Sequence, residues 1–170
     1  MEDFFGSDGI LKQRLPHFDY RPQQQALAEK IEQFLRTGLH LLAAEAPTGI
    51  GKTYAMLIPA MEWATSNNST VLVLTSGITL QEQLIGKDIP VLLDVLGMEL
   101  PYGLLKGRGN YACLRKALEI SREGFLDFGG DRGQVSRDIG QWLYSTETGD
   151  LSELGLPDSH PAKERIASSY

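Results

Sequence analysis

Ala46-Pro47-Thr48-Gly49-Ile50-Gly51-Lys52-Thr53 is the stretch of this sequence that decides the fold. The apolar run Leu39–Ala44 precedes it, and Tyr54–Leu57, which is typical of a helix start, follows it. A strand, a glycine-containing loop that ends in Gly-Lys-Thr, and a helix together form the setting of a phosphate-binding loop. The sequence therefore predicts that Ala46–Thr53 binds the phosphates of a nucleotide.

Each residue type in this phosphate loop, Ala46–Thr53, has a chemical reason. Glycines let the backbone curl so that its N–H groups point at an anion, and the start of the following helix adds partial positive charge. Lys52 can reach the β- and γ-phosphates of ATP, and the hydroxyl of Thr53 can ligate Mg²⁺. We therefore predict Lys52 and Thr53 as catalytic residues, with ATP and Mg²⁺ as cofactors. Ala46 stands where the general pattern has Gly, and A-x-T-G-x-G-K-T resembles the form found in helicases.

The segments around the loop alternate between strand and helix patterns, which predicts an α/β fold with a parallel sheet flanked by helices. The predicted strands are Leu39–Ala44, Thr70–Thr75 and Tyr102–Leu105. The predicted helices run from Pro22 to the stop at Gly38, from Lys52 to Thr65 through Pro59, from Leu80 to Ile85, and from Pro90 to Gly97.

The pattern changes after Leu105, where Lys106–Tyr111 is basic and rich in glycine. Helical spacing follows at Cys113–Ser121, Gln134–Tyr144 and Ala162–Ala167. We therefore predict two domains, 1–105 and 106–170.

Composition limits the functional classes. The net charge is −6, so any binding to nucleic acid must use a local basic patch. Cys113 is the only cysteine, which excludes an internal disulfide and is typical of a cytoplasmic protein. The N-terminus has no signal-peptide pattern, and no apolar run approaches the about 20 residues of a membrane span, so no membrane partner is expected.

Five segments in order resemble the DinG/XPD branch of the superfamily 2 iron–sulfur DNA helicases, from about residue 18 onward. Three of them lie in the first part of the chain: Tyr20–Gln24 is similar to the Q-motif, Glu45–Thr53 to the first motif, and Thr75–Pro90 to motif Ia. The other two follow it: Leu105–Cys113 is similar to the segment with the first cluster cysteine, and Trp142–Leu154 is similar to the insert. Five ordered segments are far more specific than a phosphate loop alone.

The resemblance implies a RecA-like ATP-binding domain over 1–105, followed by the start of a helical iron–sulfur-type insert. It implies an ATP-dependent 5′-to-3′ DNA helicase that acts on single-stranded or forked DNA, with a role in DNA repair. Gln24 would bind the adenine edge, since an amide offers both a donor and an acceptor; alternatively, it faces solvent at a helix start. Cys113 would ligate a [4Fe–4S] cluster in a full-length relative; alternatively, it is a free thiol.

The resemblance also implies contacts to nucleic acid, from Thr75, Gln81 and Gln83 in motif Ia. We expect Lys106 and Arg108 to contact phosphates as part of a basic patch. Ordinary surface positions and a solvated charge run are the alternatives for these two groups.

Several features of the family are missing from this sequence. Relatives carry an Asp-Glu-x-His box, four cluster cysteines and a second RecA-like domain with an arginine finger, whereas this chain has one cysteine and no such box. We therefore expect an N-terminal, ATP-binding part that lacks the C-terminal helicase regions, is inactive alone and cannot assemble the cluster from its own residues. The alternatives are another phosphate-loop NTPase and a non-catalytic nucleic-acid-binding module.

Overall fold

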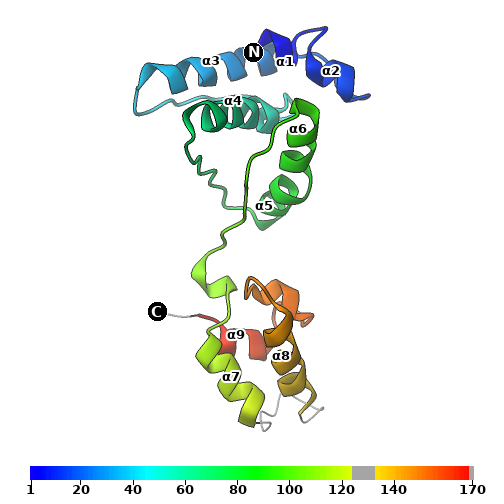
Figure 1. Ribbon diagram of the computed structural model, residues 1–170, viewed down its shortest axis with the longest axis vertical. Coiled ribbons are helices and arrows are strands. Elements are labelled where there is room, and N and C mark those ends of the chain that lie inside the picture. The colour runs from blue at the N-terminus through cyan, green and yellow to red at the C-terminus, as the bar shows by residue number, and fades with distance from the viewer. Residues whose placement is uncertain (124–132, 169–170) are drawn as a thin grey trace. The chain divides into compact units, whose positions relative to one another are not determined.

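The computed structural model describes residues 1–123 and 133–168, and in these ranges the chain is helical (Figure 1). It divides into two compact units, Met1–Leu104 and Leu105–Tyr170. No helix among the described residues is long and apolar enough to cross a membrane.

The helices of the first unit follow from local signals in the sequence. They are α1 (Glu2–Phe5), α2 (Ile10–Arg14), α3 (Pro22–Thr37), α4 (Lys52–Asn67), α5 (Ile78–Gln83), the π-helix η1 (Leu84–Asp88) and α6 (Ile89–Leu96). Pro22 occupies the first turn of α3, where its missing N–H costs nothing, and Gly38 ends the helix in the left-handed conformation at φ 68°. Gly97 ends α6 in the same way. The predicted helices at Pro22, Lys52 and Pro90 are therefore confirmed.

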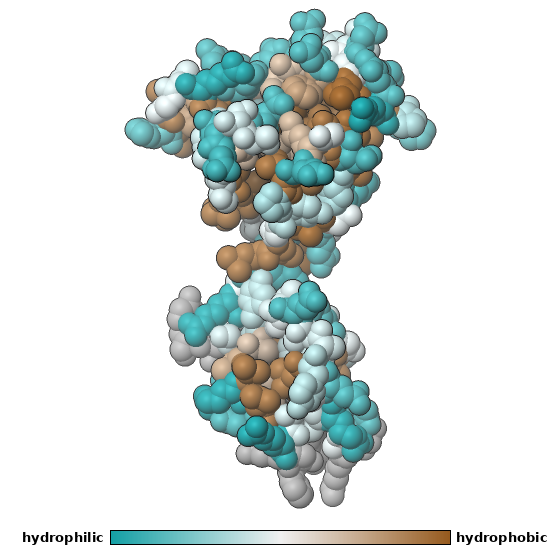
Figure 2. All heavy atoms as spheres, viewed as in Figure 1, coloured by the Kyte–Doolittle hydropathy of each residue, from teal (hydrophilic) through white to brown (hydrophobic). Residues whose placement is uncertain are grey.

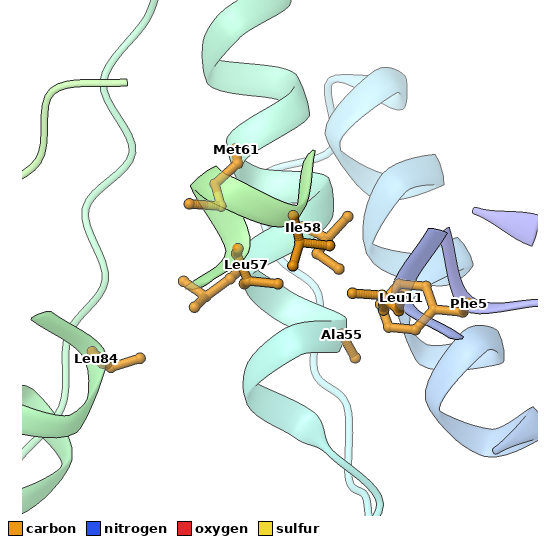
Figure 3. Packing of buried hydrophobic residues seen from close by; sticks show 10 residues of the cluster. Phe5, Leu11, Ala55, Leu57, Ile58, Met61 and Leu84 are labelled. Carbon is orange, nitrogen blue, oxygen red and sulfur yellow. The ribbon is translucent and has the colours of Figure 1, made fainter. Parts of the chain in front are cut away.

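The core of the first unit lies around α4, which packs along α3 (Figure 1). Phe5 and Leu11, from the two short N-terminal helices, lie side by side next to α4, which contributes Ala55, Leu57 and Ile58 (Figure 3). This packing holds the N-terminus of α4, and with it the phosphate loop, against α3.

The predicted parallel sheet is wrong: Leu39–Ala44, Thr70–Thr75 and Tyr102–Leu105 form no strands. Instead, Leu72 and Leu74 are 74% and 83% exposed, and brown apolar atoms lie on the visible surface of this unit (Figure 2). An apolar run indicates that a segment is suited to burial, but a strand also needs the backbone of a neighbouring segment. Among the described residues, bridges of the β type occur only as two isolated pairs in the second unit.

The second unit has its own helices and its own core. The helices are η2 (Arg108–Asn110), α7 (Leu114–Glu123), α8 (Gln134–Ser145), η3 (Leu151–Leu154) and α9 (Pro161–Ile166). Ala117, Ile139, Trp142 and Ile166 are among its buried residues. The helical patterns predicted after Leu105 are thus confirmed.

A part-buried ion pair ties the start of the second unit to η3. Lys106 Nζ lies 2.6 Å from Asp150 Oδ2, and Ser152 donates to the same carboxylate through its N–H and its hydroxyl. Burial alone would raise the pKa of Asp150, but Lys106 and Ser152 overcome it and hold the pKa below its ordinary value. The carboxylate is therefore stabilised in its charged form.

Candidate nucleotide-binding site

The phosphate loop depends on two glycines in a backbone conformation that other residues avoid. Gly49 and Gly51 have φ values of 84° and 86°. Side chains with a Cβ rarely adopt this left-handed region, whereas glycine enters it freely. The two glycines turn the chain sharply between Pro47 and Lys52, as the sequence predicts for an anion-binding loop.

The first turn of α4 presents backbone N–H groups that have no partner among the residues the structure describes. The first N–H that bonds back along the helix is that of Ala55, which donates to the carbonyl of Gly51. Lys52, Thr53 and Tyr54 donate no backbone hydrogen bond to any of the described residues. Unpaired N–H groups at the positive end of a helix are suited to bind an anion.

The ammonium group of Lys52 folds back over the loop. Its Nζ donates to the carbonyls of Ala46 and Pro47 at 2.9 and 3.0 Å. The side chain is exposed, as are Pro47, Thr48 and Gly49, whereas Ala46 and Ile50 are half-buried. The loop therefore curls around its own lysine, and a phosphate can recruit this cation by replacing two neutral carbonyls.

Two residues from the start of α3 hold the loop from the other side. Gln24 Nε2 donates to the carbonyl of Gly51 at 2.9 Å, and Arg21 donates to the carbonyl of Gly49. Gln24 is 3% exposed, so the alternative that it faces solvent is excluded. The role of Arg21 was missed by sequence reasoning, although it lies in the Arg-Pro-Gln-Gln segment that carried the resemblance.

A cavity of about 290 Å³ lies beside the loop, close to the lower end of the volumes typical of small-molecule sites. Gln24, Gly51 and Thr53 line it, and so do two residues that sequence reasoning missed, Tyr54 and Asp88. Burial raises the pKa of Tyr54, and the charge of Asp88 raises it further, so the phenol stays protonated near neutral pH. Asp88 lies in the segment similar to motif Ia, but that resemblance gave it no role at the nucleotide, and η1 brings it to the cavity from a distant part of the sequence.

The residues predicted to contact DNA in motif Ia bond to one another or to the cavity wall. Gln81 Nε2 lies 3.3 Å from the carbonyl of Thr75, and Gln83 Nε2 donates to Asp88 Oδ2 at 2.8 Å. Contact of Thr75, Gln81 and Gln83 with DNA stays a prediction. The phosphates of a DNA backbone would have to compete with the carboxylate of Asp88 for the side-chain amide of Gln83.

The other predicted residues lie in the second unit. Lys106 is paired with Asp150, and Arg108 Nε donates to Ser168 Oγ at 3.1 Å. Cys113 precedes α7, where the backbone N–H of Lys116 lowers the pKa of its thiol, although burial opposes the shift. No three His, Cys, Asp or Glu side chains gather into a metal site within the described ranges.

Together, the curled loop, the N–H groups of the first turn of α4, Lys52 and the adjoining cavity form a candidate nucleotide site of the phosphate-loop class. Comparison with known proteins identifies relatives of this chain. A family described as type III restriction enzyme, res subunit, matches residues 17–93. The chain is homologous over most of its length to the N-terminal part of the DinG/YoaA-type superfamily 2 DNA helicases, and this family resemblance is confirmed.

Three relatives illustrate the match. The chain is 32% identical over 152 residues to the 3′-5′ exonuclease DinG of Bacillus subtilis, which covers 89% of the chain and 16% of the relative. It is 30% identical over 168 residues to the ATP-dependent DNA helicase YoaA of Haemophilus influenzae, which covers 98% of the chain and 25% of the relative. It is 43% identical over 100 residues to the ATP-dependent helicase DinG of Mycobacterium tuberculosis, which covers 56% of the chain and 15% of the relative. The chain thus spans a quarter or less of the length of these relatives.

Proposed function

We propose that this chain binds Mg·ATP through Ala46–Thr53 and forms the ATP-binding, N-terminal part of an ATP-dependent DNA helicase of the DinG/YoaA type. The observation that carries the proposal is the first turn of α4, where three N–H groups bond to none of the described residues and the Lys52 ammonium lies over the loop. Gly51 and Thr53 bring this turn to the wall of the cavity. Anionic phosphates match all of these groups in charge and in hydrogen bonding.

Each loop residue has a role in this proposal. The N–H groups of Lys52, Thr53 and Tyr54 hold the phosphates, and Lys52 exchanges the carbonyls of Ala46 and Pro47 for phosphate oxygens. The hydroxyl of Thr53 makes no hydrogen bond to the described residues and lines the cavity, which suits a ligand of Mg²⁺. Bound Mg²⁺ neutralises phosphate charge. Gln24 leaves Gly51 to bind the adenine edge, because its amide has both a donor and an acceptor.

The proposal extends to the two units and to their partner. Residues 1–105 correspond to the first part of the relatives' ATP-binding domain, and residues 106–170 to the start of the insert. Single-stranded or forked DNA in the cytoplasm is the proposed partner, with 5′-to-3′ movement and a role in repair. Thr75, Gln81, Gln83, Lys106 and Arg108 are the proposed contacts. A [4Fe–4S] cluster does not fit the described residues, since Cys113 would need ligands from outside this chain.

The chain alone is expected to hydrolyse ATP very slowly. Phosphoryl transfer depends on an oriented water and on a cation that stabilises the transition state. The resemblance assigns these groups to an Asp-Glu-x-His box, which this sequence does not contain, and to an arginine finger of a second RecA-like domain. Loss of such groups is expected to lower the rate by about a thousandfold or more. ATPase turnover that disappears in Lys52→Ala would show that another acid of this chain serves as the base.

Calorimetry with Mg·ATP and Mg·ADP tests the proposal. Lys52→Ala is expected to weaken binding by about tenfold to a hundredfold, because it removes hydrogen bonds between charged groups. Lys30→Ala is the matched control, since Lys30 is an exposed lysine on α3 that does not line the cavity. Equal affinities of the wild type and Lys52→Ala would contradict the assignment of the loop. Binding of DNA without any binding of ATP would favour a non-catalytic nucleic-acid-binding module.

A further inference from the structure

The carboxylate of Asp88 has an unusual environment at the end of η1. It is 4% exposed and lines the cavity beside the phosphate loop. Gln83 Nε2 donates to Oδ2 at 2.8 Å, and no other hydrogen bond or ion pair reaches this carboxylate from the described residues. A buried carboxylate that accepts a hydrogen bond on only one of its two oxygens carries a desolvation cost, and a hydrogen-bond donor on a ligand can offset this cost.

The cavity therefore offers two opposite kinds of chemistry. Gly51 and Thr53 bring the phosphate loop to its wall, where the N–H groups of the first turn of α4 favour an anion. Asp88 lines the same cavity, and its negative charge repels phosphate and attracts hydroxyl or amine donors. The ligand that matches this wall has phosphates attached to a part rich in hydrogen-bond donors. A nucleotide has this form, since its ribose carries two hydroxyls close to the phosphate chain.

We propose that Asp88 recognises the sugar of the bound nucleotide: its free carboxylate oxygen accepts a hydrogen bond from the ribose 2′-hydroxyl, and Gln83 is the positioning residue that fixes the carboxylate. The inference rests on the proposed function, because it takes the phosphates to lie in the loop. It makes the site selective for ribonucleotides over deoxyribonucleotides, by a residue that lies outside the phosphate loop and the α3 segment.

Calorimetry with unmodified ATP, 2′-deoxy-ATP and inosine triphosphate tests this proposal. The wild type is expected to bind ATP about tenfold more tightly than 2′-deoxy-ATP, as one hydrogen bond to a charged acceptor predicts. Asp88→Asn is expected to reduce that ratio to about threefold or less, because the acceptor loses its charge. Its affinity for 2′-deoxy-ATP should stay within about threefold of the wild type, which also shows that the variant is folded. Gln83→Ala should reduce the ratio in part.

Glu82→Gln is the matched control, because it removes an exposed carboxylate next to Gln83. This variant should keep the tenfold ratio of the affinities for ATP and 2′-deoxy-ATP. A wild type that binds ATP and 2′-deoxy-ATP equally, with Lys52-dependent affinity, would overturn the role of Asp88 and leave the proposed function standing. The same holds if Asp88→Asn keeps the full ratio. If only inosine triphosphate binds more weakly, Asp88 reads the base amine and the sugar assignment is overturned. Absence of Lys52-dependent binding would overturn both proposals.

Discussion

Gln24 and Gly51 are in direct contact across 27 positions of the sequence: the amide of Gln24 donates to the carbonyl of Gly51 at 2.9 Å. A Cβ at position 51 would lie 2.2 Å from Gln24 Nε2 and 2.8 Å from its Cδ. The buried amide thus fills the space that any side chain at position 51 would need. The contact couples the loop to the first turn of α3, so we expect substitutions of Gln24 and Gly51 to have non-additive effects on the free energy of unfolding.

Gly51→Ala is expected to destabilise the first unit more than Gly49→Ala. Both positions have positive φ, and a non-glycine residue there costs about 1–3 kcal/mol. A Cβ at Gly49 meets nothing within 4 Å, so this variant carries the backbone strain alone. Urea unfolding of both variants, alone and combined with Gln24→Ala, measures the extra cost of the contact. The difference should shrink in the Gln24→Ala background, and a difference that persists there would contradict the steric explanation.

Acid is expected to weaken the second unit through Asp150. Its folded pKa lies below the ordinary value, so its ion pair contributes stability above about pH 4, the unfolded pKa, and that contribution is lost as pH falls through the folded pKa. Asp150→Asn should lower the free energy of unfolding by about 1–3 kcal/mol at neutral pH. The variant should also lose less of its free energy of unfolding than the wild type as the pH falls. In a Trp63→Phe background, the fluorescence of Trp142 reports on this unit alone.

The exposed Glu147 provides the control for this experiment, since it lies in the segment that precedes Asp150. Glu147→Gln should leave both the stability and its dependence on pH close to the wild type. If Asp150→Asn retains the full acid dependence, other carboxylates are responsible for it.

The thiol of Cys113 is expected to react with iodoacetamide at lower pH when the protein is folded. The backbone N–H of Lys116 stabilises the thiolate, so the pKa of the thiol is lowered in the folded state only. The midpoint of the rate against pH should rise toward the ordinary cysteine value when the same protein is unfolded in urea. Lys116→Ala should keep most of the shift, because it keeps the N–H. A midpoint that is identical in folded and unfolded protein would contradict this interpretation.

Ile58→Ala is expected to destabilise the first unit by about 2–5 kcal/mol, because Ile58 is fully buried between α4 and its neighbours. Met56→Ala on the same helix is the control, since Met56 is 43% exposed. Met56→Ala should change the free energy of unfolding by only about 0.5 kcal/mol, as is typical of substitutions at exposed positions. In a Trp142→Phe background, urea unfolding followed by the fluorescence of Trp63 distinguishes the two outcomes, and equal losses would show that the α4 core is packed differently.

Local signals predicted the helices that begin near Pro22, Lys52 and Pro90, but not the two short helices before Pro22 or the contacts between distant segments. Pro22, Gly38 and Gly97 act within one turn of the helix that they begin or end, so the sequence pattern determines them directly. The strands failed for the opposite reason. Leu39–Ala44 and Thr70–Thr75 have the composition of buried strands, but a strand requires a partner that no local pattern supplies.

The same distinction applies to the site. The glycines and Lys52 of the phosphate loop form a contiguous motif, and the structure gives that motif the expected turn. Arg21 and Asp88 reach the loop and the cavity from elsewhere in the sequence, so only the packing of α3 and η1 reveals them. The π-helix that presents Asp88 has no sequence signature comparable to Gly-Lys-Thr, although such helices are frequent at functional sites.

The extended segment Thr70-Val71-Leu72-Val73-Leu74-Thr75 has a consequence for how this protein behaves at high concentration. It is apolar, carries no charge, proline or glycine, and is largely exposed. A short, uncharged stretch of β-branched and aliphatic residues with unpaired backbone groups is a template for cross-β stacking between molecules. The net charge of −6 opposes the approach of two copies, and added salt screens that repulsion. Aggregation should therefore increase with ionic strength, and a lysine in place of Val73 should act as a gatekeeper that slows it.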